Sequence, residues 1–499
     1  MNCKGEIKAE RVTKFLLLYL CIGISFFTYG MFLNAHYSVD SYSVYFSGDP
    51  QIHLMNTRYI NYFCMKLFDA LHFNTVSSQS CGTFMLILTI AYIIYEITKQ
   101  LYQAASARIN ILCGEFLIAI CVGLSFCNVF MLEWFLYPEI TIFYSLSLLF
   151  CLGAIKIWCL NQRIPNAVSA TVLLLCSLLC YQAAFAYFGF FCILYMLINE
   201  DLKYTKILFK RIVCTFCIIF LSCSAMLILQ KIFTREIEAR TANLSFYTVI
   251  QNIKQIIQLQ LQLLYDGNGF FIQFILGVGL IVLSLCLCQV VGKFTNNPIN
   301  IFLLILGCIG ICYSMVFTPH LFTSTLWFAP RTMVGFWTVF SMISIIIIVI
   351  STSWSYRIIT LITMMILLVC NVFLIHSIGV NHFITNYLDR EYSEEIEKNI
   401  KKYEAESNTS ISKIATVFDA SPSYSYPGIK YVKYDTNTKA FSVDWGDVNT
   451  INFYNQTNYK KVPFVNSMLE FNPHDYNWND FVPDEQLIFK GDTLVIIKY

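Results

Sequence analysis

Long uninterrupted apolar runs constrain the fold of this chain more than any other feature. Several of them reach the roughly 20 residues that a helix needs to cross a bilayer, among them residues 15–33, 140–160 and 358–378. Charged residues make up 13% of the 499-residue chain, whereas about 25% is usual for a soluble protein. The runs are also too continuous for the alternating strands of an outer-membrane barrel. The sequence therefore predicts an all-α polytopic membrane protein.

The order of apolar and basic segments predicts about eleven transmembrane helices before residue 379. The stretch 167–198 is too long for one span, and we interpret it as two short spans that meet at the polar pair Tyr181-Gln182. With the N-terminus inside, the cations between spans also fall inside, as the positive-inside rule requires. The C-terminus is then outside. Treating 167–198 as a single span would reverse the orientation of every later span. The basic cluster at 203–211 argues against that reversal.

The composition changes after Gly379, which divides the chain into two predicted domains. Residues 1–379 form the transmembrane domain, and residues 380–499 are polar and rich in Asn, Asp, Tyr and Lys. We expect a helix over about 389–406, because acids come early in it and lysines late, as the helix dipole favours. Strand-like runs follow, namely KIATVF, GIKYVKY, AFSVDW, TINFY and TLVIIKY. The second domain is therefore predicted to be a small α+β unit on the outer face.

The first outer loop, residues 34–80, is the first place where acidic, basic and aromatic residues gather. Asp40 and Asp49 lie in its Ser/Tyr/Gly-rich part, and Arg58 precedes a segment with helical apolar spacing. The same topology places other polar residues at outer span ends, and ionisable groups there are functional candidates. These are Glu133, Glu139, Tyr181, Gln182, His320 and Arg331.

These residue types suit the transfer of a group from a lipid phosphate to a hydroxyl. A carboxylate can take the proton of an attacking hydroxyl, and we assign that role to Asp40. An arginine can hold a phosphate through paired hydrogen bonds, which Arg58 and Arg331 would supply.

Each candidate also has a purely structural interpretation. Asp40 could only solvate its loop, Arg58 could extend its charge from a surface helix, and Arg331 could be an interfacial anchor. Asp49 stands between Gly48 and Pro50, which favours a turn. The remaining acids and the histidine have structural alternatives as well: Glu139 as a first-turn acid, Glu133 as an interfacial residue and His320 as a loop residue.

The partners that the composition favours are membrane lipids. The formal net charge is +2, so the whole-chain electrostatics suggest no nucleic-acid partner. Most of the cysteines that precede residue 371 lie inside apolar runs, and no Cys/His cluster has metal-ligand spacing in a polar segment. We therefore expect neither a metal nor a cofactor.

The order of these residues resembles the O-antigen glucosyltransferases of serotype-converting phages and related bacterial loci. Five short motifs carry the resemblance across about the first 380 residues: Val39-Asp40-Ser41, Arg58-Tyr59, Pro138-Glu139, Tyr181-Gln182 and Pro330-Arg331. Two of them depart from the family pattern. Where the family usually has two adjacent acids, this chain has Asp40-Ser41. Where the family usually has Gly-Arg-Trp, this chain has Thr57-Arg58-Tyr59.

The resemblance implies an inverting GT-C-type glycosyltransferase of the bacterial inner membrane. Such an enzyme takes glucose from an undecaprenyl-phosphate carrier at the periplasmic face and adds it to the lipid-linked O-antigen, before that chain joins lipopolysaccharide. Asp40 would be the general base, and Arg58 and Arg331 the phosphate binders. Further substrate contacts are assigned to Glu139, Tyr181, Gln182 and Asp49.

Two other classes of membrane protein compete with this hypothesis. An O-antigen polymerase, or another polyprenyl-phosphate-dependent glycosyltransferase, also combines many spans with outer arginines, but polymerases usually lack a sizeable outer C-terminal domain. A lipid-linked sugar flippase would show internal repeats and charges near the bilayer midplane. Here the charges cluster at span ends, which favours the enzyme.

Overall fold

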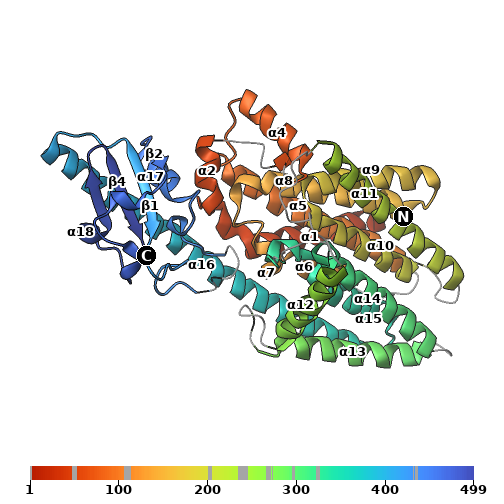
Figure 1. The fold of residues 1–499 in the computed structure, drawn as a ribbon. Helices are drawn as coiled ribbons and strands as arrows, with labels where there is room; N and C mark the ends of the chain where they lie inside the picture. The colour runs from red at the N-terminus through yellow and green to blue at the C-terminus, as the bar shows by residue number, and fades with distance from the viewer. Residues whose placement is uncertain are drawn as a thin grey trace.

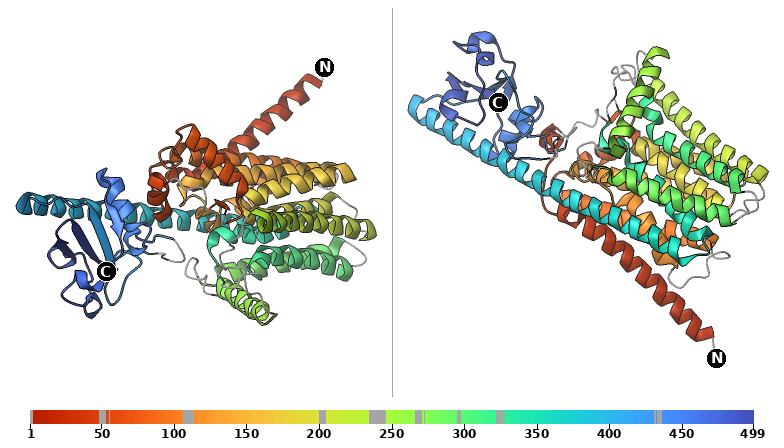
Figure 2. Two further views of the ribbon diagram at one scale, coloured as in Figure 1. Left: turned by 45° about the horizontal axis from the view of Figure 1, so that its top comes forward. Right: turned by 90° about the horizontal axis from the view of Figure 1, so that it is seen from below.

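The chain forms a bundle of helices with a small sheet-containing domain at one end (Figure 1). The computed structural model describes residues 3–47, 53–54, 56–105, 114–199, 205–233, 246–265, 271, 273–294, 298–321, 326, 328–430, 432 and 436–499. The N-terminal end of the first helix and the sheet domain lie at opposite ends of the bundle (Figure 2).

Within the described residues, eight helices are long and apolar enough to cross a membrane. They comprise α1 (Cys3–Tyr29), α5 (Gln79–Ala105), α8 (Thr141–Leu160), α11 (Thr205–Phe233), α13 (Ile275–Phe294), α14 (Pro298–Leu321) and α16 (Trp354–Ser407). The eighth is α10 (Phe185–Asn199), which together with the preceding 3-10 turn forms an 18-residue span, Gln182–Asn199. Three further apolar helices are shorter, namely α6 (Gly114–Phe126), α9 (Ile164–Cys180) and α15 (Thr338–Ile350) with the preceding 3-10 turn η6 (Val334–Trp337). The predicted helical membrane fold is confirmed, whereas the number of about eleven spans stays a prediction.

Burial separates the inner helices of the bundle from the outer ones. Every residue of α15 is buried, and α10 is buried along nearly its whole length. The first helix instead exposes large apolar side chains such as Phe15, Tyr19 and Phe27. An apolar surface of this kind suits contact with lipid, where there is no water to penalise it.

The predicted interruption at Tyr181-Gln182 is confirmed. The α-helix α9 ends at Cys180, and Tyr181 then adopts an extended conformation. A 3-10 turn, η3 (Gln182–Ala184), leads into α10. The break turns two polar side chains out of the helical repeat, at the end of the bundle that faces the sheet domain.

Short elements cover that same end of the bundle (Figure 1). They include η1 (Gly30–Leu33), α2 (Val39–Ser47), α4 (Tyr59–Ala70), α7 (Val129–Leu132), η2 (Pro138–Ile140) and η5 (Pro330–Thr332), while the helix α12 (Phe246–Tyr265) packs against α13 and α14. The helix predicted after Arg58 is thus α4, and it exposes the apolar side chains of Phe63 and Leu67.

A single helix, α16, joins the bundle to the sheet domain. It has 54 residues and is therefore about 80 Å long at 1.5 Å per residue. The predicted helix over 389–406 is its outer part, and the composition change at Gly379 falls inside it. A Cβ atom at Gly379 would lie 2.7 Å from the Met31 side chain, so glycine permits a close approach of α16 to η1.

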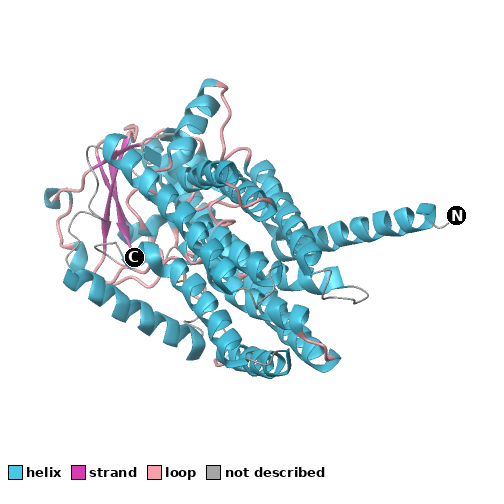
Figure 3. Cartoon of the chain, turned by 90° about the vertical axis from the view of Figure 1, so that its right-hand side faces the viewer, coloured by secondary structure: helices cyan, strands magenta, loops and turns pink. Residues whose placement is uncertain are grey.

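The C-terminal domain contains a four-stranded sheet in the order β2-β1-β4-β3 (Figure 3). The strands are β1 (Lys413–Phe418), β2 (Lys460–Val462), β3 (Leu487–Lys490) and β4 (Thr493–Lys498). β1 pairs in parallel with β2 and β4, whereas β3 and β4 are antiparallel. On β4, Leu494 and Ile496 face the core formed with α16, and Val495 and Ile497 face a second cluster.

Two of the predicted strands in this domain are wrong. The run TINFY lies in the helix α17 (Asp447–Asn455), and AFSVDW begins with the 3-10 turn η7 (Ala440–Ser442). Val448 and Ile451 are buried three residues apart, which is a helical spacing that the alternation within TINFY concealed. KIATVF and TLVIIKY are confirmed as β1 and β4. In GIKYVKY, residues 431, 433 and 434 lie outside the described residues, and the other four are not in a strand.

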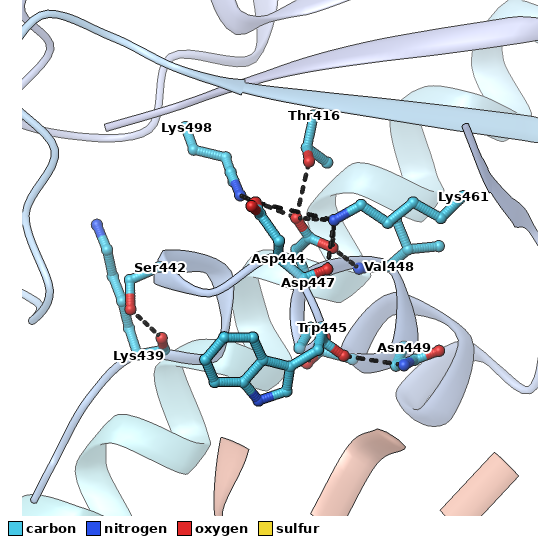
Figure 4. A network of polar contacts seen from close by, with 12 residues as sticks. Thr416, Lys439, Ser442, Asp444, Trp445, Asp447, Val448, Asn449, Lys461 and Lys498 are labelled. Atoms are coloured by element: carbon cyan, nitrogen blue, oxygen red, sulfur yellow. Dashed lines mark hydrogen bonds and ion pairs between the residues drawn. The ribbon is translucent and has the colours of Figure 1, made fainter. Parts of the chain in front are cut away.

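A buried charge cluster fixes the start of α17. The carboxylate of Asp447 accepts hydrogen bonds from Lys461 Nζ at 2.8 Å, Lys498 Nζ at 2.9 Å and Thr416 Oγ1 at 2.8 Å. These partners lie on β2, β4 and β1, so the cluster holds α17 against the sheet. In Figure 4 the indole of Trp445 points away from this cluster, toward the ribbon of the N-terminal part of the chain.

Candidate active site

Asp40 lies in the first turn of α2, and serine side chains cap that helix. Ser38 Oγ accepts hydrogen bonds from the backbone N–H groups of Asp40 and Ser41, both at 3.1 Å. Ser41 Oγ accepts in return from the N–H of Ser38 at 2.9 Å. Such reciprocal bonds satisfy N–H groups that have no partner inside a helix. The sequence S-x-x-S therefore starts α2 at a defined residue and orients Asp40.

Glu139 anchors this cap to the bundle. Its carboxylate is buried and accepts hydrogen bonds from Ser38 Oγ at 3.1 Å and from Ser41 Oγ at 2.7 Å. The charge of Asp40 is close enough to act on Glu139 electrostatically. Glu139 thus ties α2 to η2, the turn that precedes α8.

The half-buried Asp40 also contacts the C-terminal domain. Its Oδ1 accepts a hydrogen bond of 2.9 Å from the indole N–H of Trp445. Trp445 comes two residues before Asp447 and is therefore positioned by the charge cluster at the start of α17. The side chain of Asp40 lies where the two domains meet.

Arg58 is placed by a tight turn that the Tyr181-Gln182 break supports. Thr57 has a φ of +59°, which is rare for a β-branched residue and costs of the order of 1–3 kcal/mol. Gln182 Nε2 donates to Asn56 O and to Thr57 Oγ1, both at 2.8 Å. The N–H of Arg58 closes the turn by donating to His53 O at 2.8 Å.

Arg331 is held by a buried acid from the loop between α6 and α8. Its guanidinium forms an ion pair with Glu133, whose side chain is 2% exposed. The backbone N–H of Arg331 donates to the same carboxylate at 2.6 Å. Nη1 also donates to the Tyr137 hydroxyl at 3.1 Å. Glu133, for which the sequence offered an interfacial role as the structural alternative, is buried as the partner of Arg331.

The two arginines converge on a pair of tyrosines. The guanidinium carbon of Arg58 lies 4.9 Å from the centre of the Tyr181 ring. Both Arg58 and Arg331 act electrostatically on the hydroxyls of Tyr181 and Tyr144, whose rings pack edge to face at 4.8 Å. The structure therefore brings together three of the residues that the sequence singled out, Arg58, Tyr181 and Arg331.

Several polar atoms around these arginines are buried and, among the described residues, have no hydrogen-bond partner. They are Arg58 Nε, His53 Nδ1 and the Tyr144 hydroxyl. Buried polar groups are nearly always paired, so such a group of atoms points to a ligand. Burial and the nearby Arg58 lower the pKa of His53 to about 4. The imidazole is therefore neutral near pH 7, and the two guanidiniums dominate the local charge.

One segment of seven residues joins Arg331 to the helix that carries Asp40. Glu133 and Tyr137 contact Arg331, while Glu139 contacts the cap of α2. Between them, the carbonyl of Phe135 lies 2.8 Å from Nε2 of His36, just before α2. The guanidinium of Arg331 and the start of α2, which carries Asp40, are thus positioned by the same loop.

Not every expected site residue joins this arrangement. Asp49 lies outside the described residues, and His320 is buried with its Nε2 3.1 Å from Thr332 Oγ1. Among the described residues, no three His, Cys, Asp or Glu side chains come together as metal ligands. The sequence interpretation did not include Tyr144 or Trp445.

A family model described as Glucosyl transferase GtrII matches residues 29–348. The chain belongs to this family. The match covers well over half of the chain and includes the bundle residues that build the site, from Asp40 to Arg331. Membership of the GtrII family establishes a glucosyltransferase, and it confirms the resemblance to serotype-converting O-antigen glucosyltransferases. Comparisons with curated proteins and with solved structures give no significant match.

Proposed function

We propose that this glucosyltransferase moves glucose from undecaprenyl-phosphate-glucose to a sugar hydroxyl of the lipopolysaccharide O-antigen, at the periplasmic face of the bacterial inner membrane. The observation that carries the proposal is the convergence of Arg58 and Arg331 on Tyr181, beside buried polar atoms that have no hydrogen-bond partner among the described residues. Two guanidiniums in a partly buried site match the charge of a phosphodiester and can form paired hydrogen bonds with it.

The chemistry is a single displacement with inversion at the anomeric carbon. The acceptor hydroxyl attacks that carbon while its proton passes to the carboxylate of Asp40. The bond between the anomeric carbon and the phosphate oxygen breaks, and undecaprenyl phosphate leaves with the electron pair. Arg58 and Arg331 stabilise the negative charge that grows on the leaving phosphate.

The supporting residues have distinct tasks in this mechanism. Glu133 and Tyr137 orient Arg331, while Gln182 fixes the turn that carries Arg58. Glu139 holds the start of α2, and the Trp445 indole orients the carboxylate of Asp40. Asp49 remains a proposed substrate contact.

The arrangement of the two ends of the bundle supports the periplasmic side. The candidate site and the C-terminal domain lie at one end, and the N-terminal end of α1 lies at the other (Figure 2). The positive-inside rule places the N-terminus in the cytoplasm. The site then faces the periplasm, where lipid-linked O-antigen is available.

Chemical analysis of the O-antigen repeat with and without this gene tests the proposed function. We expect a glucosyl branch on the repeat only in cells that carry the gene. A loss of O-antigen chain length on deletion, with the repeat unchanged, would contradict the proposal and identify a polymerase. An unchanged repeat and an unchanged chain length would contradict it as well.

A further inference from the structure

A cavity lies beside the candidate site, where the two domains meet. It has a volume of about 580 Å³, and its walls come from α2 and the residue stretch before it, from α16 and from the end of α17. None of its lining residues belongs to the arginine pair or to the group around Glu139. The mechanism proposed above gives this cavity no role.

The lining combines aromatic rings with a few polar groups. Tyr37 and Tyr45 both pack edge to face against Phe453, with ring centres 4.8 Å and 4.9 Å apart. Tyr387 stands on α16 and is 60% exposed, and Arg390 follows one turn later. Small-molecule sites are typically apolar and aromatic with a few placed polar groups. The apolar faces of sugar rings fit such walls, while their hydroxyls reach the polar groups.

The charge of the cavity argues against a polyanionic ligand. Among the described residues that line it, Arg390 is the cation, and its Nε donates to Glu394 at 2.6 Å. A nucleic acid or a row of lipid phosphates would call for several uncompensated cations. An uncharged or weakly charged oligosaccharide does not.

The cavity is continuous in structure with the proposed base. Tyr37 precedes Asp40 by three residues, and Tyr45 follows it in the same helix. On the other domain, α17 runs from near Trp445, which contacts Asp40, to Phe453 in the cavity wall. Eight residues of helix span about 12 Å, so one extended ligand can contact both ends of α17.

The wall of the cavity is held by bonds between the domains. The side chain of Asn386 on α16 accepts from the N–H of Tyr37 at 2.8 Å and donates to its carbonyl at 2.9 Å. The hydroxyls of Tyr42 and Tyr454 are 2.9 Å apart. These contacts shape the cavity before any ligand enters, which lowers the entropic cost of binding.

We propose that this cavity binds the sugars of the O-antigen chain that neighbour the one that receives glucose. The proposal rests on the proposed function, because it assigns the cavity to the acceptor of the same reaction. The reacting sugar lies between Asp40 and Trp445, and neighbouring sugars extend along α17 into the cavity. The C-terminal domain thereby selects the acceptor, while the bundle binds the donor.

The test uses the full-length protein in nanodiscs and, as probe, delipidated O-antigen polysaccharide from a strain that lacks the gene. Tyr387→Ala removes one exposed ring from the cavity, and Tyr387→Phe keeps it. Tyr424→Ala is the matched control, because Tyr424 is 61% exposed on the C-terminal domain and does not line the cavity. Binding of the polysaccharide is measured directly. A transfer assay then gives the KM for the acceptor and the KM for the donor.

We expect Tyr387→Ala to weaken polysaccharide binding and raise the acceptor KM roughly tenfold, the scale of one lost aromatic contact. The donor KM should stay unchanged, and Tyr387→Phe and Tyr424→Ala should behave as wild type. Equal binding by Tyr387→Ala and wild type, or no binding by an active wild-type protein, would overturn the proposal. Polysaccharide binding by a protein that transfers no glucose would support the cavity and contradict the proposed function instead.

Discussion

Arg331 shows how a single buried acid can prepare a site for an anion. Glu133 pairs with the guanidinium and also accepts the backbone N–H of Arg331. Breaking a buried pair by removing one partner is costly, because the remaining charge has no compensation. The pair therefore fixes both the position and the orientation of the arginine before any ligand binds.

Replacing this acid tests the role of the pair. We expect Glu133→Gln, which keeps the size of the side chain but removes its charge, to raise the donor KM by about tenfold, since Arg331 loses its ionic partner. Initial rates against undecaprenyl-phosphate-glucose concentration measure this. Glu395→Gln, an exposed acid paired with Lys398 on α16, is the control and should leave the donor KM unchanged. The same KM in both variants would contradict the role of Glu133.

The sequence identified some residues of the candidate site and missed others. Arg58, Tyr181 and Arg331 were identifiable because a polar residue at the end of an apolar span needs a reason to be there. The same argument applied to Glu133, whose loop offers no cation, but its partner lies 198 positions further along the chain. Trp445 gave no signal, because its contact with Asp40 depends on how the two domains pack.

At the scale of elements, the break between α9 and α10 organises the site. It exposes Gln182, whose amide supports the left-handed Thr57 and hence the turn before Arg58. This break could be predicted, since a polar pair interrupts a long apolar run. The helix α17 could not, since TINFY alternates like a strand and becomes helical only where Asp447 meets Lys461 and Lys498.

Removing the hydrogen bonds that Gln182 gives to this turn should impair the site through Arg58. Gln182→Leu leaves Asn56 O and Thr57 Oγ1 without the donor they now share, so the turn that presents Arg58 loosens. We expect a rise in the donor KM of a few-fold to about tenfold with the acceptor KM unchanged. The control is Gln162→Leu, which changes a glutamine near the other end of α9 and is measured in the same transfer assay. A shift of the acceptor KM alone would show that Gln182 does not act through Arg58.

At the scale of the whole molecule, one continuous helix sets the position of the C-terminal domain. Because α16 passes from the bundle into that domain without a loop, the two parts keep a fixed direction relative to each other. The composition change at Gly379 was visible in the sequence, but the continuity of the helix was not. The sequence also could not show that α17 packs against α2 and so reaches Asp40.

The sidedness of the molecule can be measured with inserted epitope tags. A tag at Pro422, in an exposed part of the C-terminal domain, should be accessible to protease added outside spheroplasts. A tag after Asn161, between α8 and α9, should become accessible only when the membrane is permeabilised. The reverse pattern would place the site in the cytoplasm and remove the basis for periplasmic transfer.

The role of Asp40 as general base is the central claim and can be measured directly. The transfer rate of Asp40→Asn should fall at least about 100-fold, the usual contribution of a general base, while binding of the undecaprenyl-phosphate-glucose donor persists. Asp69→Asn, which alters an exposed acid on α4 at the same end of the bundle, should keep the wild-type rate. If Asp40→Asn transferred glucose at a rate close to that of the wild type, Asp40 would not be the base.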